Sequence, residues 1–243
     1  MGRFANNTAL MLGKELSGYF GSPLAYIVLF AFLSGSAANL VWFQGFFEVG
    51  LASLRPFFEW MPWVFLVLVP PLTMRIWTEE RREGTIELLF TLPLQQSEIL
   101  IGKFLAAWTF LLVALALTLP IPLSVGAVST LDWGPVLGGY LGSALLGAAY
   151  LAIGMCASAL SKNQILSFVL AVMGCLFFLG IGSTAVTTLS DFAMSAGQML
   201  GFVPHFANVS KGVIDSRDFV YFGGLVFFFL TVNYYLIGAY RYA

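Results

Sequence analysis

Few residues in the sequence have the types and spacings that carry out chemistry. An intramembrane enzyme needs paired carboxylates, a set of metal ligands, or a nucleophile with its base. The sequence has a single histidine, His205, and no His-Glu-x-x-His motif, and its two cysteines, Cys156 and Cys175, lie in apolar stretches. We interpret the cysteines as small buried hydrophobic residues and His205 as a hydrogen-bonded structural residue. The pattern indicates neither an enzyme nor a metal site.

The pair Gly102-Lys103 resembles the end of a phosphate-binding loop only superficially. That loop requires Gly-x-x-x-x-Gly-Lys followed by Ser or Thr, whereas Phe104 follows here and no glycine stands five positions earlier. We interpret Gly102-Lys103 as a helix end. A nucleotide used by this protein would therefore bind to another chain.

Charged residues are concentrated in one short segment. The chain has 11 Lys and Arg and 12 Asp and Glu, and eight of these 23 residues fall within 75–98: Arg75, Glu79, Glu80, Arg81, Arg82, Glu83, Glu87 and Glu98. Gly84 interrupts any helix entering this segment, and Pro93 ends the next one. Between them we expect a helix of about two turns, capped by Thr85 and carrying Ile86, Leu88, Leu89 and Phe90. Ser97 is expected to cap the following helix.

The composition of the whole chain is that of a membrane protein. Hydrophobic residues make up 59% of the 243 residues and charged residues 9%, against about 25% charged in soluble domains. The net charge of −1 provides no basic surface for nucleic acid.

Gaps between charged residues predict an all-α protein with six transmembrane helices, since about 20 apolar residues cross a bilayer. The expected spans are 24–44, 57–77, 104–128, 135–159, 165–188 and 219–240. We expect Pro70-Pro71 to kink the second span, and Pro120 and Pro122 the third. The polar residues inside these spans are uncharged, which argues against an ion relay. All of 1–243 is expected to form a single membrane domain.

Two segments outside the spans have a mixed character. Residues 3–20 alternate apolar and polar groups, which favours a helix on the membrane surface, with an ordinary polar lead-in as the alternative. Residues 191–218 are too apolar for a plain loop. We interpret them as short re-entrant or interfacial helices before the sixth span, with a surface connector as the alternative. Gly138-x-x-x-Gly142 permits close helix packing, either within the chain or with a second copy.

The distribution of Lys and Arg predicts the orientation. With six spans, eight of these residues fall on the side of the termini, and three, Arg55, Lys211 and Arg217, fall on the other. Positive residues favour the cytoplasm, so both termini and the 78–97 segment are expected there. The segment 191–218 is then outside.

The charged segment resembles a known family. The run 79–93, followed by Gly102-Lys103-Phe104, is similar to the ABC type-2 permeases, whose E-x-x-x-G-T-x-E-x-L-x-x-x-P stretch contributes a coupling helix to an ATPase. The resemblance implies ATPase-coupling roles for the following residues: Glu79, Glu80, Arg81, Arg82, Glu83, Gly84, Thr85, Glu87, Leu88, Leu89 and Pro93. It implies no cofactor in this chain, because ATP and Mg bind to the partner ATPase.

A second stretch is similar to the gliding-motility-type (GldF-like) permeases. It comprises Pro204-His205-Phe206, then Gly212 and Asp215, and is expected to form an outer gate segment. The resemblance implies a permease subunit of an exporter in a bacterial inner membrane. Its partners would be a cytosolic ATPase dimer, a second copy or homologous permease, and a membrane subunit with a large outer domain.

Two other functions remain open at this point. A secondary transporter would show an internal repeat or charges inside its spans, and the sequence shows neither. A non-transporting subunit that transmits force from an ATPase to an outer partner would carry the same coupling helix. A transporting subunit requires an open route between two subunits, whereas in a non-transporting one the contact between the subunits is packed shut.

Overall fold

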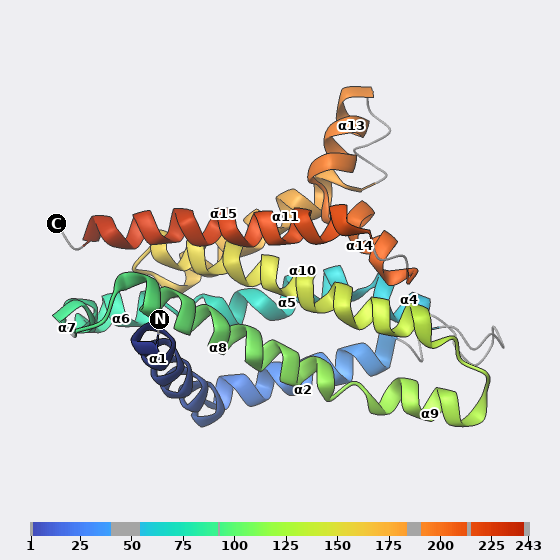
Figure 1. Cartoon of the computed structure of the whole chain (residues 1–243), viewed down its shortest axis with the longest axis horizontal. Helices are drawn as coiled ribbons and strands as arrows, with labels where there is room; N and C mark the ends of the chain where they lie inside the picture. The colour runs from blue at the N-terminus through green and yellow to red at the C-terminus, as the bar shows by residue number, and fades with distance from the viewer. Residues whose placement is uncertain (1, 40–53, 92, 184–190, 213–214, 241–243) are drawn as a thin grey trace.

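A computed structural model describes residues 2–39, 54–91, 93–183, 191–212 and 215–240, and every regular element in these ranges is a helix (Figure 1). The helices are α1 (Gly2–Gly21), α2 (Pro23–Ala38), α4 (Arg55–Glu59), α5 (Met61–Thr73), α6 (Thr78–Glu83), α7 (Thr85–Thr91), α8 (Gln96–Ala116), α9 (Pro120–Val128), α10 (Trp133–Leu160), α11 (Gln164–Ile181), α13 (Asp191–Leu200), α14 (Phe202–Ser210) and α15 (Ser216–Tyr240). The expected all-α membrane fold is confirmed.

Five helical segments are long and apolar enough to cross a membrane: Met61–Glu83, Gln96–Val128, Trp133–Leu160, Gln164–Ile181 and Ser216–Tyr240. A sixth arises if α1 and α2, bent by 75° at residue 22, are taken together. Of the expected first span, residues 40–44 lie outside the described residues, as do 184–188 of the fifth.

Prolines divide two of the expected spans. The region 57–77 contains the end of α4, then α5, then a turn at 74–77, since Pro70 and Pro71 lack the N–H groups that a continuing helix uses. The third span begins earlier than expected, at Gln96, and breaks at 117–119 before Pro120 opens α9. Both breaks fall where the prolines predict them.

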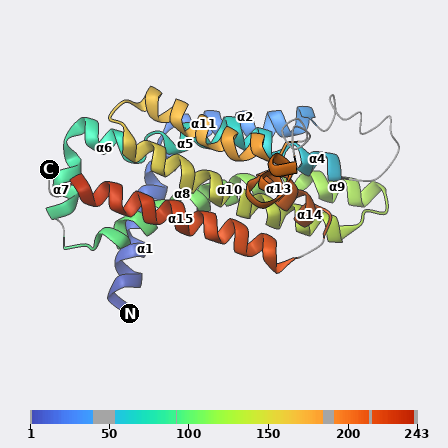
Figure 2. The same ribbon diagram turned by 90° about the horizontal axis from the view of Figure 1, so that it is seen from above.

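Helix α10 forms the centre of the bundle and is mostly buried. It packs against α5, α8, α11, α14 and α15 (Figure 2). Small residues allow these close approaches: a Cβ at Gly138 would lie 2.4 Å from the carbonyl oxygen of Val209, and one at Gly154 would lie 2.2 Å from Oγ1 of Thr73. The contacts of Gly138 and Gly142 are with α14, so these glycines serve packing within the chain.

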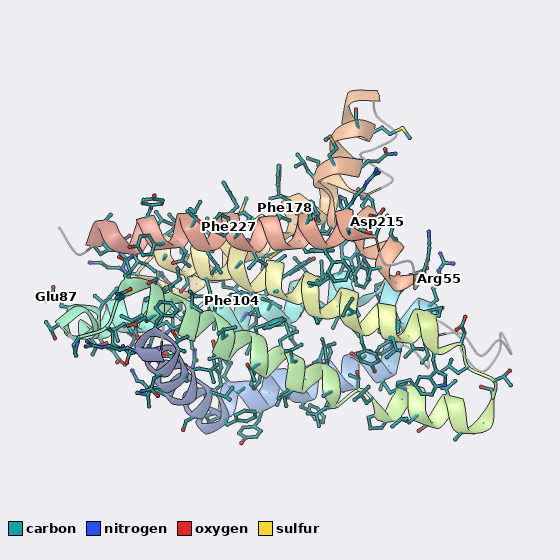
Figure 3. The ribbon with its side chains drawn as sticks, in the orientation of Figure 1. Arg55, Glu87, Phe104, Phe178, Asp215 and Phe227 are labelled. Atoms are coloured by element: carbon teal, nitrogen blue, oxygen red, sulfur yellow. The ribbon has the colours of Figure 1, made fainter. Side chains whose placement is uncertain are left out.

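Helices α11 and α15 present apolar side chains outward. Their least buried residues include Ile165, Met173, Val220 and Phe227, and Figure 3 shows Phe227 pointing away from the bundle. Exposed apolar surface of this extent is stable against hydrocarbon and not against water.

The two ends of the bundle carry different elements. Helices α6 and α7, the N-terminus and the end of α15 lie at one end, and α4, α9 and α14 lie toward the other (Figure 1). The described arrangement thus places the charged segment at the same end of the bundle as the start of α1 and the end of α15, and the side of the membrane on which this end lies stays a prediction.

The first testable prediction concerns the packing at Gly138. Replacing Gly138 with Ala forces α14 away from α10, and we expect a loss of about 1–3 kcal/mol of stability. Gly223→Ala is the matched control, because no atom lies within 4 Å of its Cβ position. Thermal unfolding of the purified proteins in detergent measures both. Equal melting temperatures for the two variants would contradict this packing.

Candidate ATPase-coupling site

The charged segment forms an elbow of two short helices. Helix α6 ends at Gly84, whose φ of 71° lies in the left-handed region that glycine adopts without strain. Thr85 is expected from the sequence to cap α7, but it is instead the first residue of that helix. Its hydroxyl instead donates to the carbonyl of Glu80, at 3.4 Å. Helix α7 ends at Thr91, two residues before Pro93. The direction change between the helices therefore depends on Gly84.

Helix α6 is held against the body of the protein by a buried lysine. Lys103 lies inside α8 and its side chain is 2% exposed. Its Nζ is 2.8 Å from Oε1 of Glu80, 2.9 Å from Oε1 of Glu15 and 3.4 Å from the carbonyl oxygen of Ile76. All three ammonium protons thus have acceptors, as a buried charge requires.

The interpretation of Lys103 as a helix end is wrong. It occupies the second turn of α8, and it joins α8 to α6 and to α1. Lys103 lies just outside the expected span 104–128, but the helical segment that could cross the membrane, Gln96–Val128, includes it. When spans are located from the gaps between charged residues, every lysine marks the end of a span. This method therefore could not predict that Lys103 is buried. The carboxylates at Glu15 and Glu80 neutralise it, but they are distant in sequence.

A second set of contacts fixes α6 to α10 and α15. Nη1 of Arg81 donates to the carbonyl of Ala159 at 2.8 Å, and the guanidinium lies 4.1 Å from the centre of the Tyr240 ring. The backbone N–H of Trp77 donates to Oγ of Ser158 at 3.0 Å. Arg81 and Glu80 therefore face this chain and not the solvent.

The remaining charges of the elbow face outward. Glu79, Arg82, Glu83 and Glu87 are exposed, and Glu87 lies at the extreme end of the bundle in Figure 3. Leu89 is buried, and Thr85 and Pro93 are exposed. The side chain of Leu88 lies outside the described ones. The predicted coupling residues thus divide into an inward pair, which anchors α6, and an outward set of three acids and one base.

The base of α8 adds a further anchor. The expected cap, Ser97, lies within the helix, and the N-cap is Gln95, whose backbone N–H donates to Oε2 of Glu98 at 2.8 Å. Both carboxylate oxygens of Glu98 also accept from Nδ2 of Asn7 at 3.2 Å. Glu98, and not Ser97, stabilises the start of α8, because its position in the first turn lets its side chain reach back to the N-cap. Helix α1 is thereby bound to α8 at two points.

The predicted outer gate residues lie around the start of α15. Nδ1 of His205 is 2.6 Å from Oδ1 of the buried Asp218, and its ring stacks on Tyr221 with the ring centres 3.9 Å apart. The structural role expected for His205 is therefore confirmed. Phe206 is buried near Gly142.

The other outer residues shape turns and helix ends. Pro204 lies in α14, where its Cδ is 3.0 Å from a Cβ position at Gly182. Gly212 has a φ of 81° and passes close to the backbone of Gly134. Asp215 accepts from the N–H of Arg217 at 2.9 Å, at the start of α15. These contacts assemble a compact end of the bundle opposite the elbow, and both its outward location and a gate there remain predictions.

The comparisons with known proteins bear on this arrangement. Residues 23–237 match the description of the ABC-2 family of transporter proteins. The chain belongs to the ABC-2 transporter family. The match spans the whole bundle from α2 to near the end of α15, so it includes the elbow. A search of the curated proteins finds no match. ABC-2 membrane proteins are permeases that work with an ATPase, and their membrane subunits are typically not catalytic.

The second prediction concerns the lysine that anchors the elbow of this ABC-2 permease. Lys103→Met leaves the partly buried carboxylates of Glu15 and Glu80 without a counter-charge, and we expect a loss of about 1–3 kcal/mol. Lys162→Met is the control, because Lys162 is exposed. Thermal unfolding in detergent measures the effect. The triple variant Glu15→Gln, Lys103→Met, Glu80→Gln removes all three charges and is expected to recover most of the loss. A Lys103→Met protein as stable as the control would refute the anchor.

Proposed function

We propose that this chain is the permease subunit of an ATP-binding cassette exporter of a bacterial inner membrane, driven by a separate cytosolic ATPase. Two permease subunits would form the pathway, and two ATPase subunits would contact them from the side of the termini. The observation that carries the proposal is the elbow: one face of α6 is anchored to α1, α8, α10 and α15, while its other face and Glu87 of α7 present charges outward.

The division of the elbow suggests how work is transmitted. The elbow contacts the ATPase through the exposed Glu87 of α7 and the exposed face of α6, and this outward set of three acids and one base suits a groove that is basic overall. Helix α6 cannot move without displacing Lys103 and hence α8 and α1. A nucleotide shifts the permease between states only if the docked ATPase binds one state of the elbow better than the other. The Gly84 turn sets the angle between α6 and α7 through which this difference in affinity acts on the rest of the permease.

The gliding-motility-type subfamily is the finer assignment that we propose, from the stretch around Pro204-His205-Phe206. It brings with it a further membrane subunit that has a large outer domain. The compact end opposite the elbow supports a docking surface for such a partner.

The third prediction tests the contact with the ATPase. We expect a single cysteine at Glu87→Cys, in a chain purified from its native membrane, to form cross-links with a co-purifying protein that carries a phosphate-binding loop. Thr130→Cys, exposed near the other end of the bundle, is the control and is expected to form none. The native cysteines are buried and do not compete. Mass spectrometry of the cross-linked band identifies the partner. Cross-linking from position 130 only would place α7 on the wrong side.

The fourth prediction tests the turn at Gly84. Gly84→Pro cannot adopt a φ of 71°, because the proline ring fixes φ near −65°. We expect ATP hydrolysis by the reconstituted complex to fall to the level of the ATPase without its permease. Gly84→Asn is the control, since asparagine tolerates the left-handed region, and it is expected to retain most of the stimulation. Full stimulation with proline at this position would show that the elbow does not couple.

A further inference from the structure

A cavity lies where the bend between α1 and α2 meets the turn between α5 and α6. It has a volume of about 340 Å³, and its polar lining comprises Glu15, Tyr19, Ser22, Arg75, Glu79, Glu80 and Lys103. Polar α1 gives way to apolar α2 at this bend, so the cavity lies at the level where the chain enters the hydrocarbon. This location at the membrane boundary sets the kind of molecule that reaches the cavity.

Arg75 has no partner for its charge among the described residues. Its Nε is fully buried and donates to no acceptor, and Oε2 of Glu80 is likewise buried without a donor. Lys103 is already satisfied by Glu15 and by Oε1 of Glu80. Buried polar groups are normally hydrogen-bonded, so an unpaired cation beside an unpaired carboxylate oxygen indicates a missing ligand. The ligand needs an acidic group for Arg75 and a proton donor for Glu80.

An apolar groove continues from this cavity. It has a volume of about 650 Å³ and runs between α2 and the α4–α5 region, and Leu24 lines both hollows. Its wall extends along one stripe of α2 from Leu24 to Asn39 and reaches Trp60 and Trp63 on the facing side. The 15 residue steps correspond to about 22 Å of helix, which exceeds the roughly 15 Å depth of one hydrocarbon leaflet. A lipid chain anchored at the cavity would therefore fit within the groove.

We propose that this chain holds one phospholipid with a primary-amine zwitterionic head group, of the phosphatidylethanolamine type, in the leaflet on the side of α7. The phosphate accepts from Arg75, the ammonium group donates to Glu80 and Glu79, and an acyl chain occupies the groove. A zwitterion matches the charge of both unpaired groups, whereas the phosphatidylglycerol head group offers the carboxylate oxygen only neutral hydroxyl donors, which form weaker bonds than an ammonium group. A choline head group matches the phosphate but has no N–H to donate. The inference requires only that the chain crosses the bilayer.

The fifth prediction uses native mass spectrometry of the purified full-length chain in detergent. It is titrated with phosphatidylethanolamine, phosphatidylcholine and phosphatidylglycerol of identical acyl chains. We expect phosphatidylethanolamine to bind most tightly, and Arg75→Gln to weaken it by about tenfold or more, as the loss of a charge-assisted hydrogen bond implies. Arg75→Lys is expected to recover most of the affinity. Arg82→Gln, on an exposed arginine of α6, is the control and is expected to leave binding unchanged.

A second arm tests the groove. Ala31→Trp fills the groove and is expected to weaken all three lipids alike, while Ala37→Trp, exposed on another face of α2, changes nothing. If Arg75→Gln fails to fold, the comparison of the three lipids and the two groove variants still tests the proposal. Equal binding of the three lipids, or binding of soluble O-phosphoethanolamine as tightly as of the lipid, would overturn the proposal. So would indifference of binding to both Arg75→Gln and Ala31→Trp.

Discussion

The organisation of the end of the bundle that carries the elbow depends on the buried ammonium group of Lys103. A lone charge in this environment is unstable, so the chain must bring two carboxylates to it, one from α1 and one from α6. This requirement fixes the position of three helices that are far apart in sequence. It also determines which face of α6 is turned inward, and therefore which charges of the elbow remain exposed. The chemistry of a single side chain thus sets the shape of the surface offered to a partner.

The packing of α10 complements this ionic anchor. Helices in a bilayer gain little from burying apolar surface, so close contact and hydrogen bonds hold them together. At Gly138 and Gly154, α14 and α5 lie so close to α10 that a Cβ atom would not fit between the helices. Toward the elbow, Ser158 and the carbonyl of Ala159 bind the start of α6 directly. The central helix therefore joins the opposite end of the molecule to the elbow through continuous contact.

Much of this architecture could be predicted from the sequence, because the bilayer imposes a simple rule on charge. Gaps between charged residues located the crossing helices, and the prolines located the breaks at 74–77 and 117–119. Gly84 and Pro93 bounded the short helix α7, since their effects on the backbone are local. Where the outcome depended on tertiary contact, no local pattern of residues predicted it. The cap of α8 passed to Gln95 because Glu98 reaches back to it, and Glu80 and Arg81 turned inward because Lys103 and Tyr240 lie there.

The contrast between the two ends of the bundle bears on how such a molecule moves. Each end is held by a buried ionisable contact, Lys103 with its carboxylates at one end and His205 with Asp218 at the other. Neither contact tolerates much separation, because parting the partners would leave a charge buried alone. Motion is therefore expected at the places that carry no such contact: the proline breaks and the Gly84 turn. An input at α7 would then pass through α6 into α8 and α1 by way of Lys103, and into α10 and α15 by way of Arg81.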